Sequence, residues 1–295
     1  MSSSTRRLLR QRVTQGPVLM APGAANALTA RIIEDLGYEA VYVTGAGIAN
    51  TYLGTPDVGL VTLTELAGHV SAIRDAVELP LVVDIDTGFG NAVGVGRTVR
   101  EIQRAGADAL QLEDQVSPKK CGHFAGKRVI PTAEMVQKIH AVVDSRDDED
   151  VLVIARTDAR AELGFDAAVE RAHAYIEAGA DLTFVEAPRT LEEVHSLPSL
   201  LPVPQVVNLV EGGRTPLLPI SELKDFGIAI YANAALQAAA RGVQRVMGTL
   251  LRTGSLVDTL DDLVGWEERQ RLVRKPLFDE LERRYTVAEE ITPSS

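Results

Sequence analysis

The sequence predicts an α/β fold, a (β/α)8 barrel of the TIM type, from three observations. Eight short apolar runs recur along the 295 residues, which is the strand number of such a barrel. The runs are almost continuously apolar, as parallel strands covered on both faces should be. Longer stretches with a helical spacing of apolar residues separate them. Hydrophobic residues make up 45 % of the chain, which is enough to bury one large core.

The elements follow one another in a βα order along the chain. The predicted strands cover residues 18–20, 40–43, 81–83, 109–112, 151–155, 182–185, 205–207 and 228–231. Helical spacing is clear over 98–105, 166–178 and 235–252. Glycine ends the preceding helix at Gly37, Gly106, Gly179 and Gly227. The acidic run 146–150 is most simply a solvated loop. We therefore expect a barrel domain over 1–254 and a charged helical tail over 255–295.

Composition excludes several classes of function. The net charge of -11 argues against binding to nucleic acid or to anionic membranes. No apolar run is long enough to cross a bilayer, and residues 1–15 lack the apolar core of a secretory signal. The single cysteine rules out an internal disulfide and a thiolate metal cluster. We expect a cytoplasmic protein that acts on a small molecule.

Polar residues collect where the predicted strands end, and in such a barrel the active site lies at that end. They are Thr44, followed by the small residues Gly45 and Ala46, and Asp84, Asp86, Glu113, Asp114, Arg156, Asp158, Glu186 and Asn208. Positions i and i+2 of a strand face the same way, so Asp84 and Asp86 would point together. Buried carboxylates are costly without a partner, and Mg²⁺ or Mn²⁺ with its preference for oxygen ligands would offset that cost. The alternative is that each residue merely caps a loop.

The only cysteine lies in the segment Lys119-Lys120-Cys121-Gly122-His123. Nearby positive charge lowers the pKa of a thiol, which suits a thiolate or a proton donor. The alternative, a buried inert cysteine, fits this polar segment poorly. His123 is either a catalyst or a hydrogen-bonding loop residue. The glycines after Thr44 lack a dinucleotide fingerprint, but their amides could bind a carboxylate.

Three segments carry a resemblance to a known family. They are Asp-Ile-Asp-Thr-Gly-Phe-Gly at 84–90, Glu-Asp-Gln at 113–115 and Lys-Lys-Cys-Gly-His at 119–123. Here the chain resembles the isocitrate lyase/phosphoenolpyruvate mutase superfamily, and the match extends from about Met20 to Arg252. Its length is similar to that of the short branch, which includes the 2-methylisocitrate and 2,3-dimethylmalate lyases, oxaloacetate hydrolase and the phosphonomutases.

The resemblance implies roles for individual residues. Mg²⁺ would lie near Asp57, Asp84, Asp86 and Glu113. Contacts to a carboxylate substrate would come from Thr44, Gly45, Ala46, Asp57, Lys120, Gly122, Arg156, Glu186, Asn208 and Asn233. Cys121 would lie on a mobile loop that closes over the substrate. The family commonly exchanges its last barrel helix between subunits, which implies a homodimer or homotetramer.

The implied reaction is cleavage of a 2-hydroxy dicarboxylate or tricarboxylate to pyruvate and a second carboxylate. Cys121 would act as general acid, Arg156 would offset negative charge, and Tyr42 or a metal-linked carboxylate would be the base. Two departures bear on the substrate: Thr44-Gly45-Ala46 replaces Ser-Gly-Gly of the methylisocitrate lyases, and Asn233 lies where many relatives differ.

Several alternatives stay open at this stage. On the same scaffold they are oxaloacetate hydrolysis or decarboxylation and a carboxyphosphonoenolpyruvate-type phosphonomutase reaction. Outside catalysis, they are a sensor that binds a metal and a dicarboxylate, and a purely structural oligomerisation protein.

Overall fold

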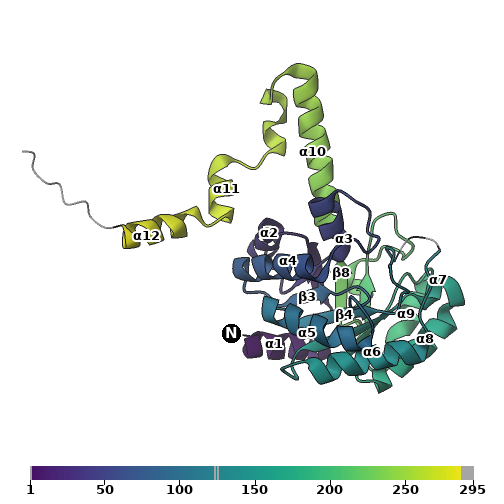
Figure 1. Cartoon of the computed structure of the whole chain (residues 1–295). Helices are drawn as coiled ribbons and strands as arrows, with labels where there is room; N and C mark the ends of the chain where they lie inside the picture. Colours follow the sequence, from purple (N-terminus) through teal and green to yellow (C-terminus); the bar gives the residue numbers. More distant parts are fainter. Residues whose placement is uncertain (1, 123, 125, 287–295) are drawn as a thin grey trace, which may run out of the picture. The chain divides into compact units, whose positions relative to one another are not determined.

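The computed structural model describes residues 2–122, 124 and 126–286, and it confirms the predicted (β/α)8 fold class (Figure 1). All eight predicted strands are present, with ends that differ by a few residues. They are β1 Leu19–Ala24, β2 Val41–Val43, β3 Leu81–Asp84, β4 Ala109–Glu113, β5 Leu152–Thr157, β6 Leu182–Val185, β7 Val206–Asn208 and β8 Ile228–Tyr231.

The strands form one parallel sheet that curls into a nearly closed barrel. Its order is β6-β5-β4-β3-β2-β1-β8-β7, so each strand pairs with its neighbour in sequence and β1 pairs with β8. The last gap, between β6 and β7, is spanned by a parallel bridge between Thr183 and Gln205. The Thr183 hydroxyl also donates to Gln205 Oε1 at 2.8 Å.

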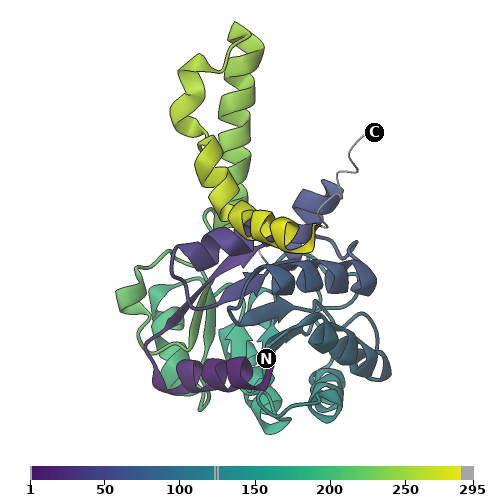
Figure 2. The same ribbon diagram turned by 90° about the vertical axis from the view of Figure 1, so that its left-hand side faces the viewer.

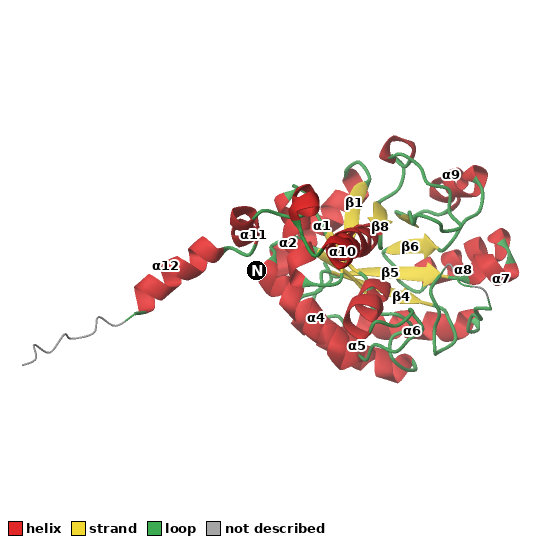
Figure 3. Ribbon diagram, turned by 90° about the horizontal axis from the view of Figure 1, so that it is seen from above, coloured by secondary structure: helices red, strands yellow, loops and turns green. Residues whose placement is uncertain are grey.

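Helices surround the strands, as Figure 3 shows from above. The longer ones of the barrel are α2 Ala27–Asp35, α4 Leu63–Ala76, α5 Ala92–Ala105, α6 Thr132–Ser145, α8 Phe165–Glu177 and α9 Leu191–Leu200. Shorter turns are α3 Gly45–Ile48, η1 Ala49–Leu53, α7 Ala159–Leu163 and η2 Ile220–Glu222. Local sequence explains the ends: Thr62 and Glu65 form a capping box at the start of α4, and Gly106 ends α5 with a φ of 113°.

A helix that the sequence analysis did not predict, α1 Ser2–Gln15, closes the amino-terminal end of the barrel (Figure 2). Leu9 and Val13 of α1 belong to the same buried cluster as residues inside the barrel, such as Leu19 and Tyr42. The acidic run 146–150 is therefore more than a solvated loop. Two of its carboxylates, Asp147 and Asp148, pair with the buried Arg6 of α1, at 3.4 and 3.2 Å.

The chain divides into two compact units, Met1–Ala240 and Arg241–Ser295. The second holds most of α10 Ala234–Thr253, and then η3 Val257–Asp262, α11 Trp266–Leu272 and α12 Lys275–Tyr285. This unit exposes many large apolar side chains, among them Met247, Leu251, Leu260, Trp266, Phe278 and Tyr285. A contact between subunits through the tail stays a prediction. Within the residues described, no helix is long and apolar enough to cross a membrane.

Candidate active site

The carboxyl ends of the strands bring the predicted polar residues to one end of the barrel. Thr44 follows β2, Asp84 and Glu113 end β3 and β4, Glu186 follows β6, and Asn208 ends β7. All five are buried, with at most 8 % of the residue exposed. Parallel strands that pair in register place these ends side by side, which is why residues far apart in sequence meet here.

Asp84 and Asp86 face the same space, but for a different reason from the predicted one. β3 ends at Asp84, so strand alternation does not orient Asp86. Asp86 instead has a φ of 48°, in the left-handed region that costs a non-glycine residue free energy. Its backbone N–H donates to Asp84 Oδ1 at 3.1 Å. A Cβ built on Gly45 would lie 3.3 Å from a carboxylate oxygen of each, so Gly45 leaves a cradle beside them.

Lys119 provides the positive charge nearest to these carboxylates. Its ammonium lies 2.5 Å from Asp57 Oδ1 and 2.7 Å from Asp86 Oδ1, and its side chain is 4 % exposed. Burial raises the pKa of Asp86 to about 6, although Lys119 opposes that shift. From the sequence, Lys120 was expected instead, as a residue that contacts the substrate. The structure places the Lys120 side chain in solvent, with its ammonium 3.1 Å from the carbonyl of Gly126, and does not bring it among the carboxylates.

Arg156 joins three carboxylates on three neighbouring strands. Its guanidinium lies 3.3 Å from Glu113 Oε2, 2.9 Å from Asp158 Oδ2 and 3.3 Å from Glu186 Oε2. Its carbon Cζ also stacks over the ring of Phe184, 5.3 Å from the centroid. The arginine is therefore held in one orientation, with a planar fork suited to carboxylates.

Asp158 and Asp114 hold Arg156 and the turn that follows it; the sequence places both at strand ends but indicates no role for either. Asp158 accepts hydrogen bonds from Arg156 Nε and Nη2, and the Arg156 charge and Lys127 hold the pKa of this buried carboxyl at about 2 despite its burial. Asp114 in turn accepts from the backbone N–H of Asp158 at 2.9 Å and from the Thr157 hydroxyl at 2.7 Å. These contacts fix the turn after β5.

The segment that carries Cys121 lies against this cluster. The backbone N–H of Cys121 donates to the carbonyl of Asp57 at 3.0 Å. A Cβ on Gly122 would lie 2.5 Å from Arg156 Nη2 and 2.7 Å from the Glu186 side chain, so only glycine fits here. Gln115 holds the neighbouring residue, because its side chain both donates to the carbonyl of Lys120 and accepts from its N–H. His123 lies outside the described residues.

The remaining predicted residues line the same end of the barrel or its interior. Thr44 Oγ1 caps α3 by accepting from the N–H of Gly47 at 3.1 Å, and Ala46 is half-buried. The Oδ1 atoms of Asn208 and Asn233 are buried and accept no hydrogen bond from any described residue. Tyr42 is buried, and its hydroxyl donates to Gln111 Oε1 at 3.3 Å. Burial raises the pKa of Tyr42 well above its ordinary value, which favours a neutral phenol.

The residues fit a hard divalent cation. The buried cluster holds six carboxylates: Asp57, Asp84, Asp86, Glu113, Asp158 and Glu186. It holds three cationic side chains, Lys119, Lys127 and Arg156, so three negative charges are in excess. Both carboxylate oxygens of Glu113 are buried without a hydrogen bond, and burial raises the pKa of Glu113 well above its ordinary value. A bound cation would offset this charge.

In the described part of the chain, no three acidic, histidine or cysteine side chains are arranged to hold one ion together. Mg²⁺ does not require such a cage, because it usually keeps several waters and binds through one or two carboxylates and the substrate. The oxygen-only donor set and the cradle at Gly45 are consistent with that mode of binding.

Two buried lysines, Lys119 and Lys127, are the main residues that sequence reasoning missed. Both lie in the loop between β4 and α6, where no periodicity indicates which side chains point inward. Lysines are rarely fully buried without a partner, but burial itself is not visible in the sequence. The sequence signal that could have indicated buried lysines was the excess of acidic residues at the strand ends. Buried carboxylates require positively charged side chains from elsewhere in the chain.

Known proteins resemble this chain over nearly its whole length. The family model described as phosphoenolpyruvate phosphomutase matches residues 9–251. The 2,3-dimethylmalate lyase of Eubacterium barkeri is 43% identical over 279 residues, which cover 94% of this chain and 96% of that protein. The 2-methylisocitrate lyase of Aeropyrum pernix is 42% identical over 275 residues, which cover 90% of this chain and 88% of that protein.

Two solved structures show the same fold over nearly the whole chain. Oxaloacetate acetylhydrolase in complex with 3,3-difluorooxalacetate has a TM-score of 0.90 and 31% identity, covering 97% of this chain and 98% of that chain. Phosphonopyruvate hydrolase in complex with oxalate and Mg²⁺ has a TM-score of 0.86 and 32% identity, covering 95% of this chain and 99% of that chain. A magnesium site thus occurs on this fold.

Replacing Lys119 by methionine should strengthen Mg²⁺ binding. The ammonium lies against two carboxylates that are predicted to face the metal, and loss of one nearby unit charge should tighten binding about tenfold, even when water screens part of it. Calorimetric titration with Mg²⁺ measures this directly. Lys120→Met is the matched control, because it removes a charge from the exposed neighbour. Equal or weaker affinity in Lys119→Met would show that the ammonium does not compete for this site.

Proposed function

Because this chain belongs to the phosphoenolpyruvate mutase/isocitrate lyase superfamily, we propose that it is a Mg²⁺-dependent carbon–carbon lyase. Its substrate is a 2-hydroxy dicarboxylate or tricarboxylate of the 2,3-dimethylmalate or 2-methylisocitrate type. Cleavage between C2 and C3 yields pyruvate and a second carboxylate. The two curated relatives described above carry these names and are more than 40% identical to this chain, which supports the substrate class.

The observation that carries this proposal is the packing of the cysteine segment on Arg156. Gly122 lies so close to Arg156 and Glu186 that no side chain fits, and Cys121 is the preceding residue. The backbone next to Cys121 therefore lies beside a fixed guanidinium and a set of buried carboxylates, which supports a role for the thiol in this site. This combination suits a substrate that is an anion and that needs a proton after its bond breaks.

The charged residues have different roles in binding the substrate. Arg156, whose Nε and Nη2 already donate to Asp158, contributes the positive charge that offsets the negative charge growing as C2–C3 breaks. Asp57, Asp84, Asp86 and Glu113 would hold Mg²⁺, in part through water, and the bound ion would supply Lewis-acid stabilisation of the charge that develops on the substrate. The amides after Thr44 and the buried side-chain oxygens of Asn208 and Asn233 orient the rest of the substrate.

Two proton transfers complete the reaction. The 2-hydroxyl proton passes to a base, the C2–C3 electron pair moves to C3, and the Cys121 thiol gives its proton to C3 as general acid. For the base, the raised pKa of the buried Tyr42 favours a metal-linked carboxylate over the phenol. Tyr42 then serves as a hydrogen-bond donor. His123 follows Cys121 by two residues in the sequence, and we assign it to the same proton transfer.

A second candidate is hydrolysis of oxaloacetate. The fold of oxaloacetate acetylhydrolase superposes on this chain with a TM-score of 0.90. A phosphonomutase of the carboxyphosphonoenolpyruvate type is a weaker third candidate. A purely binding or structural role would not call for the cysteine segment to pack against Arg156.

A substrate panel tests the proposal. The purified protein with Mg²⁺ is incubated with 2,3-dimethylmalate, 2-methylisocitrate, isocitrate and oxaloacetate, and products are followed by NMR. Pyruvate from one of the methylated hydroxy acids supports the lyase and identifies its substrate. Consumption of oxaloacetate alone supports the hydrolase or decarboxylase. Turnover of none of the four contradicts both.

Cys121→Ser should lower kcat by about a hundredfold or more, because a hydroxyl is a far weaker acid than a thiol and general acid catalysis contributes roughly 10²–10⁴-fold. Mg²⁺ affinity should stay unchanged, because the thiol is not in the predicted donor set. Steady-state kinetics and magnesium titration measure the two quantities. Full activity of the serine variant would remove Cys121 from the mechanism.

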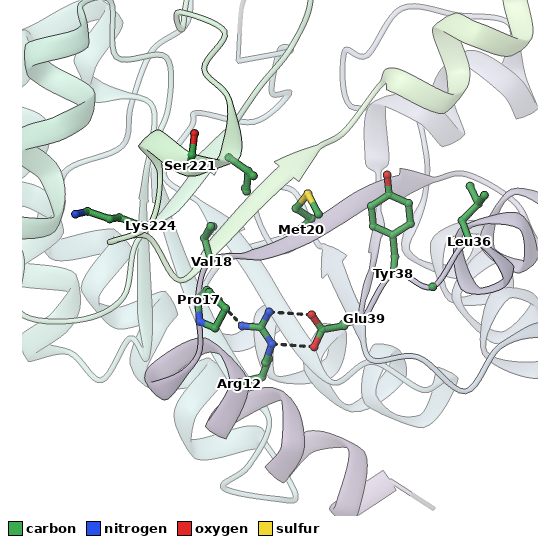
Figure 4. Close-up of a pocket in the computed structure, with 11 residues that line it drawn as sticks. Arg12, Pro17, Val18, Met20, Leu36, Tyr38, Glu39, Ser221 and Lys224 are labelled. Carbon is green, nitrogen blue, oxygen red and sulfur yellow. Dashed lines mark hydrogen bonds and ion pairs between the residues drawn. The ribbon is translucent and has the colours of Figure 1, made fainter.

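We further propose that the protein is a homodimer or homotetramer that exchanges its last barrel helix, as the family resemblance implies. A pocket of 660 Å³ on the outer side of β1 is lined by Val18, Met20 and Leu36, with Arg12 paired to Glu39 at its edge (Figure 4). Met20 belongs to an inner strand, yet 39 % of it is exposed. A helix from a second copy would cover this face. The cytoplasmic location stays a prediction.

Met247→Glu should shift the protein to a smaller species. Met247 is a half-exposed apolar residue of α10, and a carboxylate there would be buried without a partner in a helix-exchanged assembly. Light scattering after size-exclusion chromatography measures the mass. Gln244→Glu, an exposed position of the same helix, is the control. A monomeric parent protein, or a mass that Met247→Glu does not change, contradicts the exchange through α10.

A further inference from the structure

Lys127 has no role in the chemistry described above, yet it is among the most completely buried charges of the chain. Its side chain is 0 % exposed. The ammonium lies 2.7 Å from Asp158 Oδ1, which is itself fully buried, and it donates a second hydrogen bond to the carbonyl of Gly122. Burying a lysine is costly, so these two contacts require an explanation.

The contacts place Lys127 between the barrel and the cysteine segment. On one side, Asp158 holds Arg156 through two hydrogen bonds, of 2.9 and 3.1 Å. On the other, the Gly122 carbonyl belongs to the residue after Cys121. The lysine therefore links the carboxylate that orients Arg156 to the backbone that carries the thiol, across five residues of the same loop.

We propose that Lys127 is a positioning residue that keeps Gly122 against Arg156 and Glu186 and so holds Cys121 at the site. A Cβ built on Gly122 would overlap Arg156 Nη2 and the Glu186 side chain, so the Gly122 backbone lies close to both. The hydrogen bond from the buried Lys127 ammonium to the Gly122 carbonyl is the interaction that holds it there. The effect on catalysis rests on the proposed role of Cys121, whereas the effect on the position of the segment does not.

The proposal accounts for the charges on both sides of the lysine. Without Lys127, Asp158 loses its ion pair with the ammonium but keeps two hydrogen bonds from Arg156, so this carboxylate still has a cationic partner. The Gly122 carbonyl, by contrast, loses its charged donor. Loss of the lysine should thus release the cysteine segment and leave the strands intact.

The single cysteine makes this measurable, because alkylation of the protein by iodoacetamide reports on Cys121 alone. Rates are taken at the high-pH plateau, where every thiol is ionised, so that a change in thiol pKa does not contribute. Lys127→Met should raise the plateau rate about tenfold, because the segment opens more often. The chain offers two controls. Arg128→Met removes an exposed charge from the same loop, and Lys138→Met removes a buried lysine that donates to the Thr87 carbonyl at 3.0 Å.

The outcomes separate this proposal from the proposed function. A faster plateau rate in Lys127→Met, with both controls at the parent rate, supports the positioning role even if the parent chain turns over none of the panel substrates. If the parent is an active lyase, kcat of Lys127→Met should fall about a hundredfold with a smaller change in KM. A parent-like alkylation rate in Lys127→Met overturns the proposal. So does an equal increase in Lys138→Met, which would point to general loosening.

Circular dichroism and thermal unfolding establish that each variant is folded. If Lys127→Met does not fold, Lys127→Gln takes its place, because it keeps a donor for the Gly122 carbonyl and loses only the charge. Its plateau rate should lie between those of the parent and a fully released segment. A parent-like rate for this variant would show that the charge is not needed to hold the segment.

Discussion

The excess of buried carboxylates at one end of the barrel is the constraint on which the rest of the site depends. Parallel strands in register deliver Asp84, Glu113 and Glu186 to the same place, and their charges must be offset there. The barrel itself contributes one cation from a strand, Arg156 of β5. The other two, Lys119 and Lys127, come from the loop after β4. Charge balance therefore makes that loop part of the site.

This requirement explains why the thiol lies where it does. Lys119 fixes the start of the segment by pairing with Asp57 and Asp86, and Lys127 fixes its far side through Asp158. Cys121 lies between these two anchors. Three ion pairs and the close approach of Gly122 to Arg156 and Glu186 determine the path of the loop. A catalytic group is thus positioned by the same charges that the substrate and the metal would meet.

The parts of this arrangement differ in how far the sequence predicts them. All eight strands were predicted, because buried parallel strands appear in the sequence as apolar runs. The end of each run locates the end of its strand to within a few residues. The helix α1 was not, since nothing in its Ser- and Arg-rich sequence indicates that Leu9 and Val13 close the barrel. The burial of Lys119 rather than Lys120 could not be predicted for a related reason. In a loop without hydrophobic periodicity, adjacent residues cannot be assigned to the buried or the exposed side. The left-handed turn at Asp86 was equally invisible, because a backbone conformation imposed by neighbours leaves no compositional signal.

The same physics explains why chemistry can change on this scaffold while the site persists. The ionic cluster cannot lose one member without leaving another buried charge uncompensated, so its residues constrain one another. Asn208 and Asn233 are under no such constraint, because their buried side-chain oxygens are neutral and accept no hydrogen bond from any described residue. Substrate groups that donate to these two oxygens can differ without disturbing Arg156 or the carboxylates. Under the proposed function, discrimination among hydroxy acids would therefore belong to the ends of β7 and β8, and bond cleavage to the ends of β3, β4 and β5 with the cysteine loop.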